Sequence, residues 1–273
     1  MTTPVPDDMS AYLSGKKLFG DDFSIDKINE WFKDEQEGYA NLGSKDRDKY
    51  VYVYHQLNIR HGFSHIAARR FKNVLGIGSA YGDEFWPIIG NIDSLTILDP
   101  SDAFSITAQV KGVPCNYSKP KSDGHLSFGD GHFDLITSLG VLHHIPNVSR
   151  VINECFRCLS AGGTMLIREP IVSMGDWTKP RPGLTKRERG IPLEIFENII
   201  QSAGFSVRRK ALCNFPPIPI LANRIGVVAY NNAIATFLDS AVSIALSWNY
   251  KYHRTNFLEK LAPASAFFVL EKK

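Results

Sequence analysis

Residues 73–84 read Asn73-Val-Leu-Gly-Ile-Gly-Ser-Ala-Tyr-Gly-Asp-Glu84, and this stretch decides the fold class. The apolar pair Val74-Leu75 leads into three glycines, Gly76, Gly78 and Gly82, and a helix-compatible segment follows. The pattern indicates a strand, a tight turn and a helix start. Such a turn brings bare backbone close to a ligand, and a helix N-terminus offers unpaired N–H groups. We interpret the stretch as a nucleotide-type cofactor site; the alternative is a glycine turn that binds nothing.

Length and composition narrow the classes of protein. The chain has 273 residues, of which 44% are hydrophobic and 22% charged, as in an ordinary globular protein of one large domain or one domain with additions. A net charge of +3 is too small to indicate a nucleic-acid partner. Residues 1–8 have neither a basic n-region nor an apolar h-region, so we expect no signal peptide.

The cysteines indicate a reducing, cytoplasmic setting. There are four, Cys115, Cys155, Cys158 and Cys213, and the middle two form a CxxC in a probable helix. No second CxxC or CxxH accompanies them, which favours two buried thiols over a metal or redox pair.

From residue 71 to about 170, strand and helix patterns alternate, which predicts a parallel sheet covered on both faces. Helices are expected over residues 148–159 and 193–203, and Gly162-Gly163 should end the first of them and turn into a strand. The expected strands cover residues 73–76, 95–98, 113–116, 133–138, 164–168, 205–213 and 265–270.

The flanking segments look helical. Residues 23–32 have a helical period with Ser24 as the N-cap, and residues 50–58 could be a short strand or a helix start, of which we favour the helix. The excursion over residues 214–262 is apolar in places, but Asp239 argues against a membrane span. We therefore predict a core over residues 71–213 with the final strand in 263–273, and helical caps over residues 1–70 and 214–262.

Asp99 is a second anchor for a cofactor. It ends the second expected strand, about 20 residues after the glycine turn, where a carboxylate can accept hydrogen bonds from both ribose hydroxyls. These two features would also suit NAD, although the glycine spacing departs from GxGxxG.

Further blocks carry a family resemblance. They are Val74-Leu-Gly-Ile-Gly-Ser-Ala-Tyr-Gly82, Ile97-Leu-Asp-Pro100, Leu126-Ser-Phe-Gly-Asp-Gly-His-Phe-Asp-Leu-Ile136, Gly140-Val-Leu-His-His-Ile-Pro-Asn147 and Glu154-Cys-Phe-Arg-Cys-Leu-Ser-Ala-Gly-Gly163. In this order they resemble the class I S-adenosylmethionine-dependent methyltransferases, in particular the UbiE-like group. The resemblance implies an α/β, Rossmann-like fold whose seven-stranded, mostly parallel sheet has helices on both faces and an antiparallel last strand.

The resemblance also implies where S-adenosylmethionine, or its product S-adenosylhomocysteine, would bind. The glycine loop would cradle the methionine part, Asp99 would hold the ribose, Asp123-Gly124 would lie near the adenine, and Leu139-Gly140 would line the cofactor. The loop residues concerned are Gly76, Gly78, Ser79, Ala80 and Gly82. Two of them depart from the family, which usually has an acid in place of Gly76 and a glycine in place of Ala80.

Candidate catalytic residues follow the fourth and fifth parallel strands. His143 or His144, with His144 preferred, could remove a proton from the acceptor; the alternative is that both are structural. Glu169 could bind the acceptor, act as base or pair with a basic neighbour. No histidine and carboxylate set has clear metal spacing, so we predict no metal site.

The loop over residues 171–190 suggests the acceptor. Its basic residues, together with Arg168, match anionic groups, although a solvated or internally paired loop is the alternative. We predict substrate contacts from Arg168, Trp177, Arg181 and Arg187. The stretch Met174-Gly-Asp-Trp177 with Gly183-Leu-Thr-Lys-Arg-Glu-Arg-Gly-Ile-Pro192 also resembles methyltransferases of bacterial polysaccharide and sugar pathways. We therefore expect O-methylation of a sugar or nucleotide sugar, with N- or C-methylation of another small metabolite and a non-catalytic cofactor-binding protein as alternatives, and neither nucleic acid nor membrane as partner.

Overall fold

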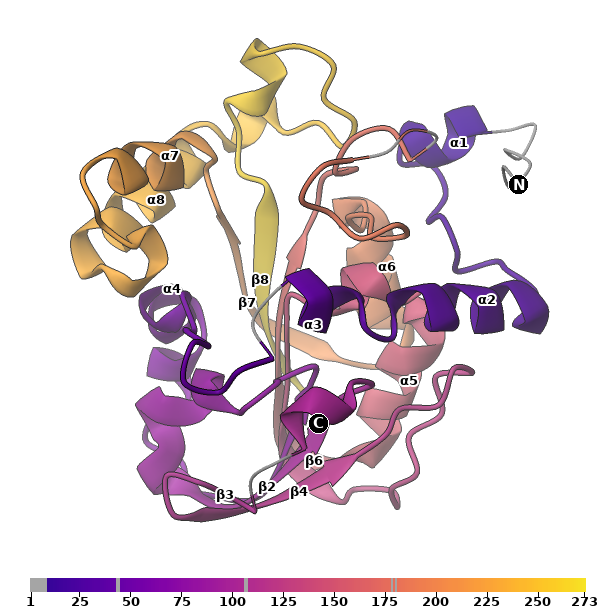
Figure 1. Cartoon of the computed structure of the whole chain (residues 1–273), viewed down its shortest axis with the longest axis vertical. Helices are drawn as coiled ribbons and strands as arrows, with labels where there is room; N and C mark the ends of the chain where they lie inside the picture. The colour runs from indigo at the N-terminus through magenta and orange to yellow at the C-terminus, as the bar shows by residue number, and fades with distance from the viewer. Residues whose placement is uncertain (1–8, 43–44, 106–107, 178, 180) are drawn as a thin grey trace.

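The computed structural model describes residues 9–42, 45–105, 108–177, 179 and 181–273. Within these ranges, eight strands form one sheet in the order β3-β4-β2-β1-β5-β6-β8-β7 (Figure 1). The strands are β1 (Phe71–Ile77), β2 (Ile92–Leu98), β3 (Gln109–Val110), β4 (Val113–Ser118), β5 (Phe133–Leu139), β6 (Leu159–Pro170), β7 (Ser206–Cys213) and β8 (Ser265–Glu271). The α-helices are α1 (Met9–Leu13), α2 (Ile25–Glu35), α3 (Gly38–Leu42), α4 (His55–His61), α5 (Val148–Cys158), α6 (Leu193–Ser202), α7 (Pro217–Arg224) and α8 (Ala233–Ala245). The 3-10 helices are η1 (Phe63–His65), η2 (Asp83–Asn91), η3 (Asp102–Phe104), η4 (Leu142–His144), η5 (Ala229–Asn231), η6 (Ser247–Asn249) and η7 (Leu258–Lys260).

The strand pairing confirms the predicted fold class. β1 lies between β2 and β5 and is parallel to both, while β8 runs antiparallel between β6 and β7. The strand beyond the seven that we predicted is β3, a two-residue piece at the sheet edge that pairs antiparallel with β4. This is a mostly parallel, Rossmann-like sheet with an antiparallel last strand.

Helices cover both faces of the sheet because successive strand residues point in opposite directions. Ile136 and Phe268 pack into a core under α5 and α6, whereas Leu135 and Phe267 pack into a second core under α4, η1 and η2. Figure 1 shows α5 and α6 on one side of the sheet and α4 on the other, with α7 and α8 near α4. Cys155 and Cys158 are buried free thiols, as predicted.

Three local expectations need correction. The segment after the glycine loop is the 3-10 helix η2 rather than an α-helix, since Pro87 inside it cannot donate a backbone hydrogen bond. Gly162-Gly163 lie within β6, which begins directly after α5, so they form no separate turn. Residues 50–54 are irregular, and the helix begins only at His55. Ser24 precedes α2 as predicted but makes no side-chain capping bond.

The flanking segments contain α1 to α4 and η1 before β1, and α7, α8 and η5 to η7 before β8, joined by non-helical stretches such as residues 50–54. No helix in the described residues has the length and apolar character needed to cross a bilayer. The division into a core and two caps stays a prediction.

Candidate cofactor and active site

A cavity of about 580 Å³ lies at the carboxyl ends of the parallel strands. Gly78 follows β1, Asp99 follows β2, Gly140 follows β5, and Glu169 lies near the end of β6, and all four line the cavity. Parallel strands end at one edge of their sheet, which is where ligands bind in folds of this type. The N-terminal segment also lines the cavity, with Glu35 and the tyrosines of residues 50–54.

The glycine loop presents bare backbone to this cavity. Gly78 has a left-handed φ of 62°, and its N–H donates to the carbonyl of Leu98 at 2.8 Å. A Cβ built on Gly78 would lie 2.6 Å from a methyl group of Val141, so only glycine fits. Ala80 also has a left-handed φ, 46°, at the position where we noted a departure from glycine.

Asp99 is buried and lines the cavity where it meets β2. Its Oδ1 accepts a hydrogen bond from the backbone N–H of Ser101 at 3.0 Å. Burial raises the pKa of Asp99 to about 6, although the N–H groups of Ser101 and Ala80 act in the opposite direction. Hydroxyl donors from a ligand would favour the ionised carboxylate.

Glu84 is a buried cavity residue that sequence reasoning missed. Its Oε1 accepts hydrogen bonds from Ser79 Oγ at 3.0 Å and from Thr137 Oγ1 at 2.6 Å. Thr137 pairs with Gly76 across β5 and β1, so Glu84 reaches the strand position that lacks the usual acid. Burial raises the pKa of Glu84 to about 7. In the sequence, the feature that could have indicated this role is the position of Glu84, two residues after Gly82.

Gly76 accommodates this arrangement. A Cβ at this position would lie 2.3 Å from Ser79 Oγ. Any side chain on Gly76 would therefore displace the serine that binds Glu84.

His143 is held by Glu169. The Glu169 carboxylate is fully buried, and its Oε1 accepts the N–H groups of Val141 and Leu142, each at 2.8 Å. Its Oε2 lies 2.8 Å from Nδ1 of His143. Glu169 therefore fixes both the loop after β5 and the His143 ring, which is a positioning role.

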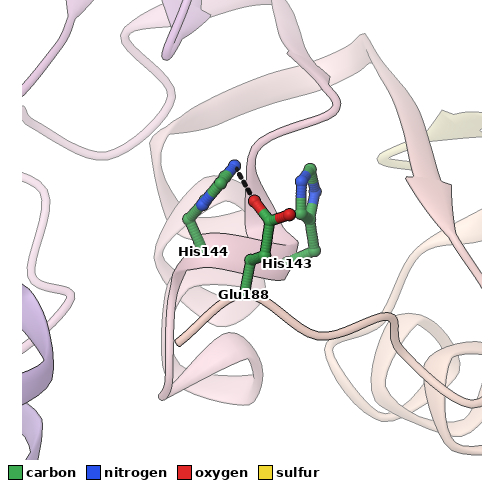
Figure 2. Close-up of side chains that lie close together, drawn as sticks. All are labelled: His143, His144 and Glu188. Atoms are coloured by element: carbon green, nitrogen blue, oxygen red, sulfur yellow. Dashed lines mark ion pairs between the residues drawn. The ribbon is translucent and has the colours of Figure 1, made fainter. Parts of the chain in front are cut away.

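His144 lies between two further carboxylates that the sequence did not single out. Its Nδ1 is 2.9 Å from Glu35 Oε2, and its Nε2 is 3.4 Å from Glu188 Oε2. Burial and the neighbouring His143 lower the pKa of His144. Burial alone would raise the pKa of Glu35, but hydrogen bonds from His144 and Thr185 hold it below its ordinary value. Figure 2 shows the Glu188 carboxylate between the two imidazole rings.

The basic loop is largely engaged in internal contacts. Arg187 pairs with Asp34 and Glu30, each at 2.7 Å, and Arg181 donates to loop carbonyls. Trp177 donates its indole N–H to the carbonyl of Ser173. None of these three basic or aromatic side chains lines the cavity, whereas Arg168 does so, with its guanidinium 3.9 Å from the Tyr54 ring centroid.

The cavity thus gathers part of the predicted residue set. The predicted residues that line it are Gly78, Ser79, Asp99, Gly124, Leu139, Gly140, His143, His144, Arg168 and Glu169. Those outside its lining are Gly76, Ala80, Gly82, Asp123, Trp177, Arg181 and Arg187. Asp123 is exposed and accepts a bond from the N–H of His125, although its neighbours Ser122 and Gly124 line the cavity.

Comparison with known proteins places this arrangement in a class. Residues 75–167 match the family model described as a methyltransferase domain. A ubiquinone biosynthesis O-methyltransferase of Shewanella pealeana is 34% identical over 96 residues, covering 34% of this chain and 41% of that protein. A ubiquinone/menaquinone biosynthesis C-methyltransferase, UbiE, of Psychromonas ingrahamii is 28% identical over 37% of this chain and 43% of that protein. The chain therefore spans less than half the length of these curated relatives.

Solved structures share the fold. The [4+2]-cyclase SpnF covers 92% of this chain and 97% of its own, with a TM-score of 0.55 and 15% identity. An S-adenosylmethionine-dependent methyltransferase from Mesorhizobium loti covers 75% of this chain and 92% of its own, with a TM-score of 0.50 and 15% identity. At this identity the likeness concerns the fold alone.

The fold, the glycine loop and the match of residues 75–167 together identify this part of the chain as a methyltransferase domain of the class I, S-adenosylmethionine-dependent type. S-adenosylmethionine is the cofactor of this class. The residues present fit it, since Gly78 leaves a cradle that a Cβ would fill and Asp99 offers a buried carboxylate in the same cavity.

Proposed function

We propose that this protein transfers a methyl group from S-adenosylmethionine to an oxygen of a small, polyhydroxylated acceptor such as a sugar. The observation that carries the proposal is one cavity that joins the glycine loop and Asp99 to His143 and His144. Its volume of about 580 Å³ falls in the range of roughly 300–1,000 Å³ of small-molecule sites.

The chain's residues divide the chemistry between binding and proton removal. Bound S-adenosylmethionine supplies an electrophilic methyl group on a sulfonium. Asp99 would accept hydrogen bonds from the ribose hydroxyls, and the backbone at Gly78 would lie against the methionine part. His144 Nε2 would take the proton of the acceptor hydroxyl, because its Nδ1 is held by Glu35. Positioning supplies most of the remaining rate enhancement.

Glu84 is our candidate for the cofactor's ammonium group. Ser79 and Thr137 occupy its Oε1, and no bond to its Oε2 is recorded within the described residues. Glu84 lines the cavity, and its partner Thr137 pairs with Gly76, where the family usually has an acid. We therefore assign to Glu84, from η2, the charge that β1 lacks.

The charges that line the cavity suit an acceptor without strong negative charge. Five carboxylates line the cavity against the basic residues Arg168 and Lys121, and the loop cations have partners elsewhere. The five are Glu35, Glu84, Asp99, Glu169 and Glu188. This observation supports a neutral sugar over a nucleotide sugar, and it makes N-methylation of a small amine the second candidate.

The cofactor assignments are tested by titrating S-adenosylhomocysteine into the full chain in a calorimeter. Asp99→Ala and Glu84→Gln should each weaken binding by about 1–3 kcal/mol, roughly 5–150-fold, because each removes a charge-assisted bond. Asp102→Ala is the matched control, since its side chain is 89% exposed and pairs only with Lys119 among the described residues. Equal affinity in all four proteins would place the cofactor elsewhere.

The acceptor class is tested by following formation of S-adenosylhomocysteine with neutral sugars, sugar phosphates and small amines. Turnover with neutral sugars that drops in His144→Ala, while cofactor affinity is unchanged, is the expected result. Turnover with amines alone would establish the second candidate. Tight cofactor binding without turnover on any acceptor would place the chain with proteins such as the cyclase, whose fold serves another reaction.

A further inference from the structure

Two histidines and one carboxylate converge at the cavity wall from segments distant in sequence. His143 and His144 belong to η4, and Glu188 comes from the long loop before α6. Each residue offers one ligand atom, and these atoms lie within 4.8 Å of one another (Figure 2). Ligands around a tetrahedral ion with bonds of about 2.1 Å are about 3.4 Å apart. Modest side-chain rotations would therefore bring the three ligand atoms to the separations that such an ion needs.

Each imidazole has its other nitrogen on a carboxylate. Nδ1 of His143 lies 2.8 Å from Glu169, and Nδ1 of His144 lies 2.9 Å from Glu35. Histidines that bind metals usually donate their second ring N–H to a carboxylate in this manner. The arrangement favours a proton on Nδ1 of each ring and directs Nε2 to an ion, with Nε2 of His144 already facing Glu188.

The contact between His144 and Glu188 is a place where positive charge is favourable. Nε2 of His144 faces Glu188 Oε2 at 3.4 Å, and the same oxygen accepts the Thr185 hydroxyl at 3.2 Å. With a proton on Nδ1, Nε2 carries a lone pair, so a cation between this nitrogen and the carboxylate would be attracted by both. Three carboxylates, Glu35, Glu169 and Glu188, surround the two rings, so a dication would be balanced by neighbouring charge.

We propose that His143, His144 and Glu188 bind a divalent first-row transition metal ion, for which Zn²⁺ is the probe. Imidazole ligands favour zinc and its neighbours over magnesium, which prefers oxygen ligands. Three protein ligands leave a fourth position open towards the cavity. The role of the ion rests on the proposed function. The acceptor oxygen would occupy the open position, and the ion would lower the pKa of the acceptor hydroxyl, whose released proton would pass to water. The ion would then replace His144 as the activating group.

The proposal is tested by metal binding, without cofactor or acceptor. The full chain is freed of metal with a chelator and titrated with ZnCl₂ in a calorimeter. We expect one site, which Glu188→Gln, His143→Ala and His144→Ala each remove. Glu35→Gln should weaken zinc binding 10–100-fold, because it disturbs the partner of His144 without removing a ligand. His65→Gln, which removes an exposed imidazole, should bind zinc as the wild type does.

Folding and ligand identity need their own measurements. Thermal unfolding of the metal-free variants identifies any variant that fails to fold, and Glu188→Gln keeps the size of the side chain. The visible spectrum of the Co²⁺-loaded wild type should show nitrogen ligands in a distorted tetrahedron. Zinc binding that is absent in the wild type, or that is equal in Glu188→Gln and the wild type, would overturn the proposal. Titration with S-adenosylhomocysteine in parallel tests the cofactor site independently.

Discussion

Ala80 adopts a left-handed backbone conformation in the glycine loop. Its φ is 46°, its side chain is buried, and its carbonyl accepts the hydroxyl of Tyr117 at 3.1 Å. A Cβ in this region costs about 1–2 kcal/mol through contact with the following carbonyl. The surrounding hydrogen bonds hold the residue there, so the loop carries this strain in the folded state.

Ala80→Gly should therefore raise the free energy of unfolding by about 0.5–1 kcal/mol. The relief of strain exceeds the extra chain entropy that glycine brings to the unfolded state. Gly82→Ala is the opposite change in the same loop, and it should destabilise, because φ is 75° and the new Cβ would lie 3.0 Å from Val110. Urea unfolding of both variants measures the difference. Destabilisation by Ala80→Gly would show that the methyl group packs more favourably than the strain costs.

At the scale of elements, Arg189 ties η4 to the N-terminal segment. Its side chain is fully buried, and its guanidinium donates to five backbone carbonyls. The carbonyls belong to Phe19, Leu142, His143, Ile145 and Pro146. Burial lowers the pKa of Arg189 to about 10, so the side chain stays charged at neutral pH.

Arg189→Met should lower the free energy of unfolding by at least about 3 kcal/mol, since several buried carbonyls lose a charged donor. Arg208→Met is the control: its guanidinium is exposed and pairs with Glu271 at 3.2 Å, so the change should stay within about 0.5 kcal/mol. Chemical denaturation of both variants gives the comparison. Similar losses in the two proteins would contradict the role assigned to Arg189.

At the scale of the whole molecule, a buried carboxyl group and a buried imidazole change the free energy of unfolding in opposite directions as pH changes. Burial raises the pKa of Glu84 to about 7 and lowers the pKa of His61 to about 4. The folded state therefore binds an extra proton at Glu84 between pH 4.5 and 7 and lacks one at His61 between pH 4 and 6.5. The two effects on stability have opposite signs and partly cancel.

Replacing Glu84 by glutamine should remove the contribution of Glu84 to the pH dependence of stability and leave that of His61. The stability from a raised carboxyl pKa is complete below the unfolded value of 4.5 and is lost as pH rises through 7. Glutamine mimics the protonated acid, so the variant should gain on the wild type with rising pH, by an amount on the order of 3 kcal/mol at pH 8. Urea unfolding without cofactor at pH 5 and pH 8 measures this gain. A constant difference between the two proteins would mean that Glu84 is ionised throughout.

The same ionisation should govern cofactor affinity. An ammonium partner favours the charged carboxylate, so binding of S-adenosylhomocysteine should weaken about tenfold between pH 8 and pH 6. Glu84→Gln should flatten most of that dependence. An equal pH dependence in the variant would assign the titration to another group, such as Asp99.

The sheet and the cofactor edge could be predicted because they depend on local patterns. Apolar runs, glycines at left-handed positions and a carboxylate at a strand end each impose their structure through neighbouring residues, as at Gly78 and Asp99. The prediction was wrong where strand pairing overrode a local pattern. A turn was predicted at Gly162-Gly163, but β6 extends through both residues. There, Gly162 donates its N–H to the carbonyl of Lys272, which follows β8.

The chemistry around the histidines was decided by tertiary structure alone. In the sequence, Glu35 lies just beyond the helical pattern of residues 23–32, Glu188 lies among basic residues, and Glu84 lies two residues after Gly82. None of the three positions indicates a buried charge. Folding brings all three into one cavity and gives the loop arginines partners outside it. The fold class and the edge of the sheet that bears the cavity follow from the sequence, because both depend on local strand and turn patterns. The polarity of the cavity was decided by tertiary structure, because contacts such as that of Glu35 with His144, 109 residues apart, form only in the folded chain.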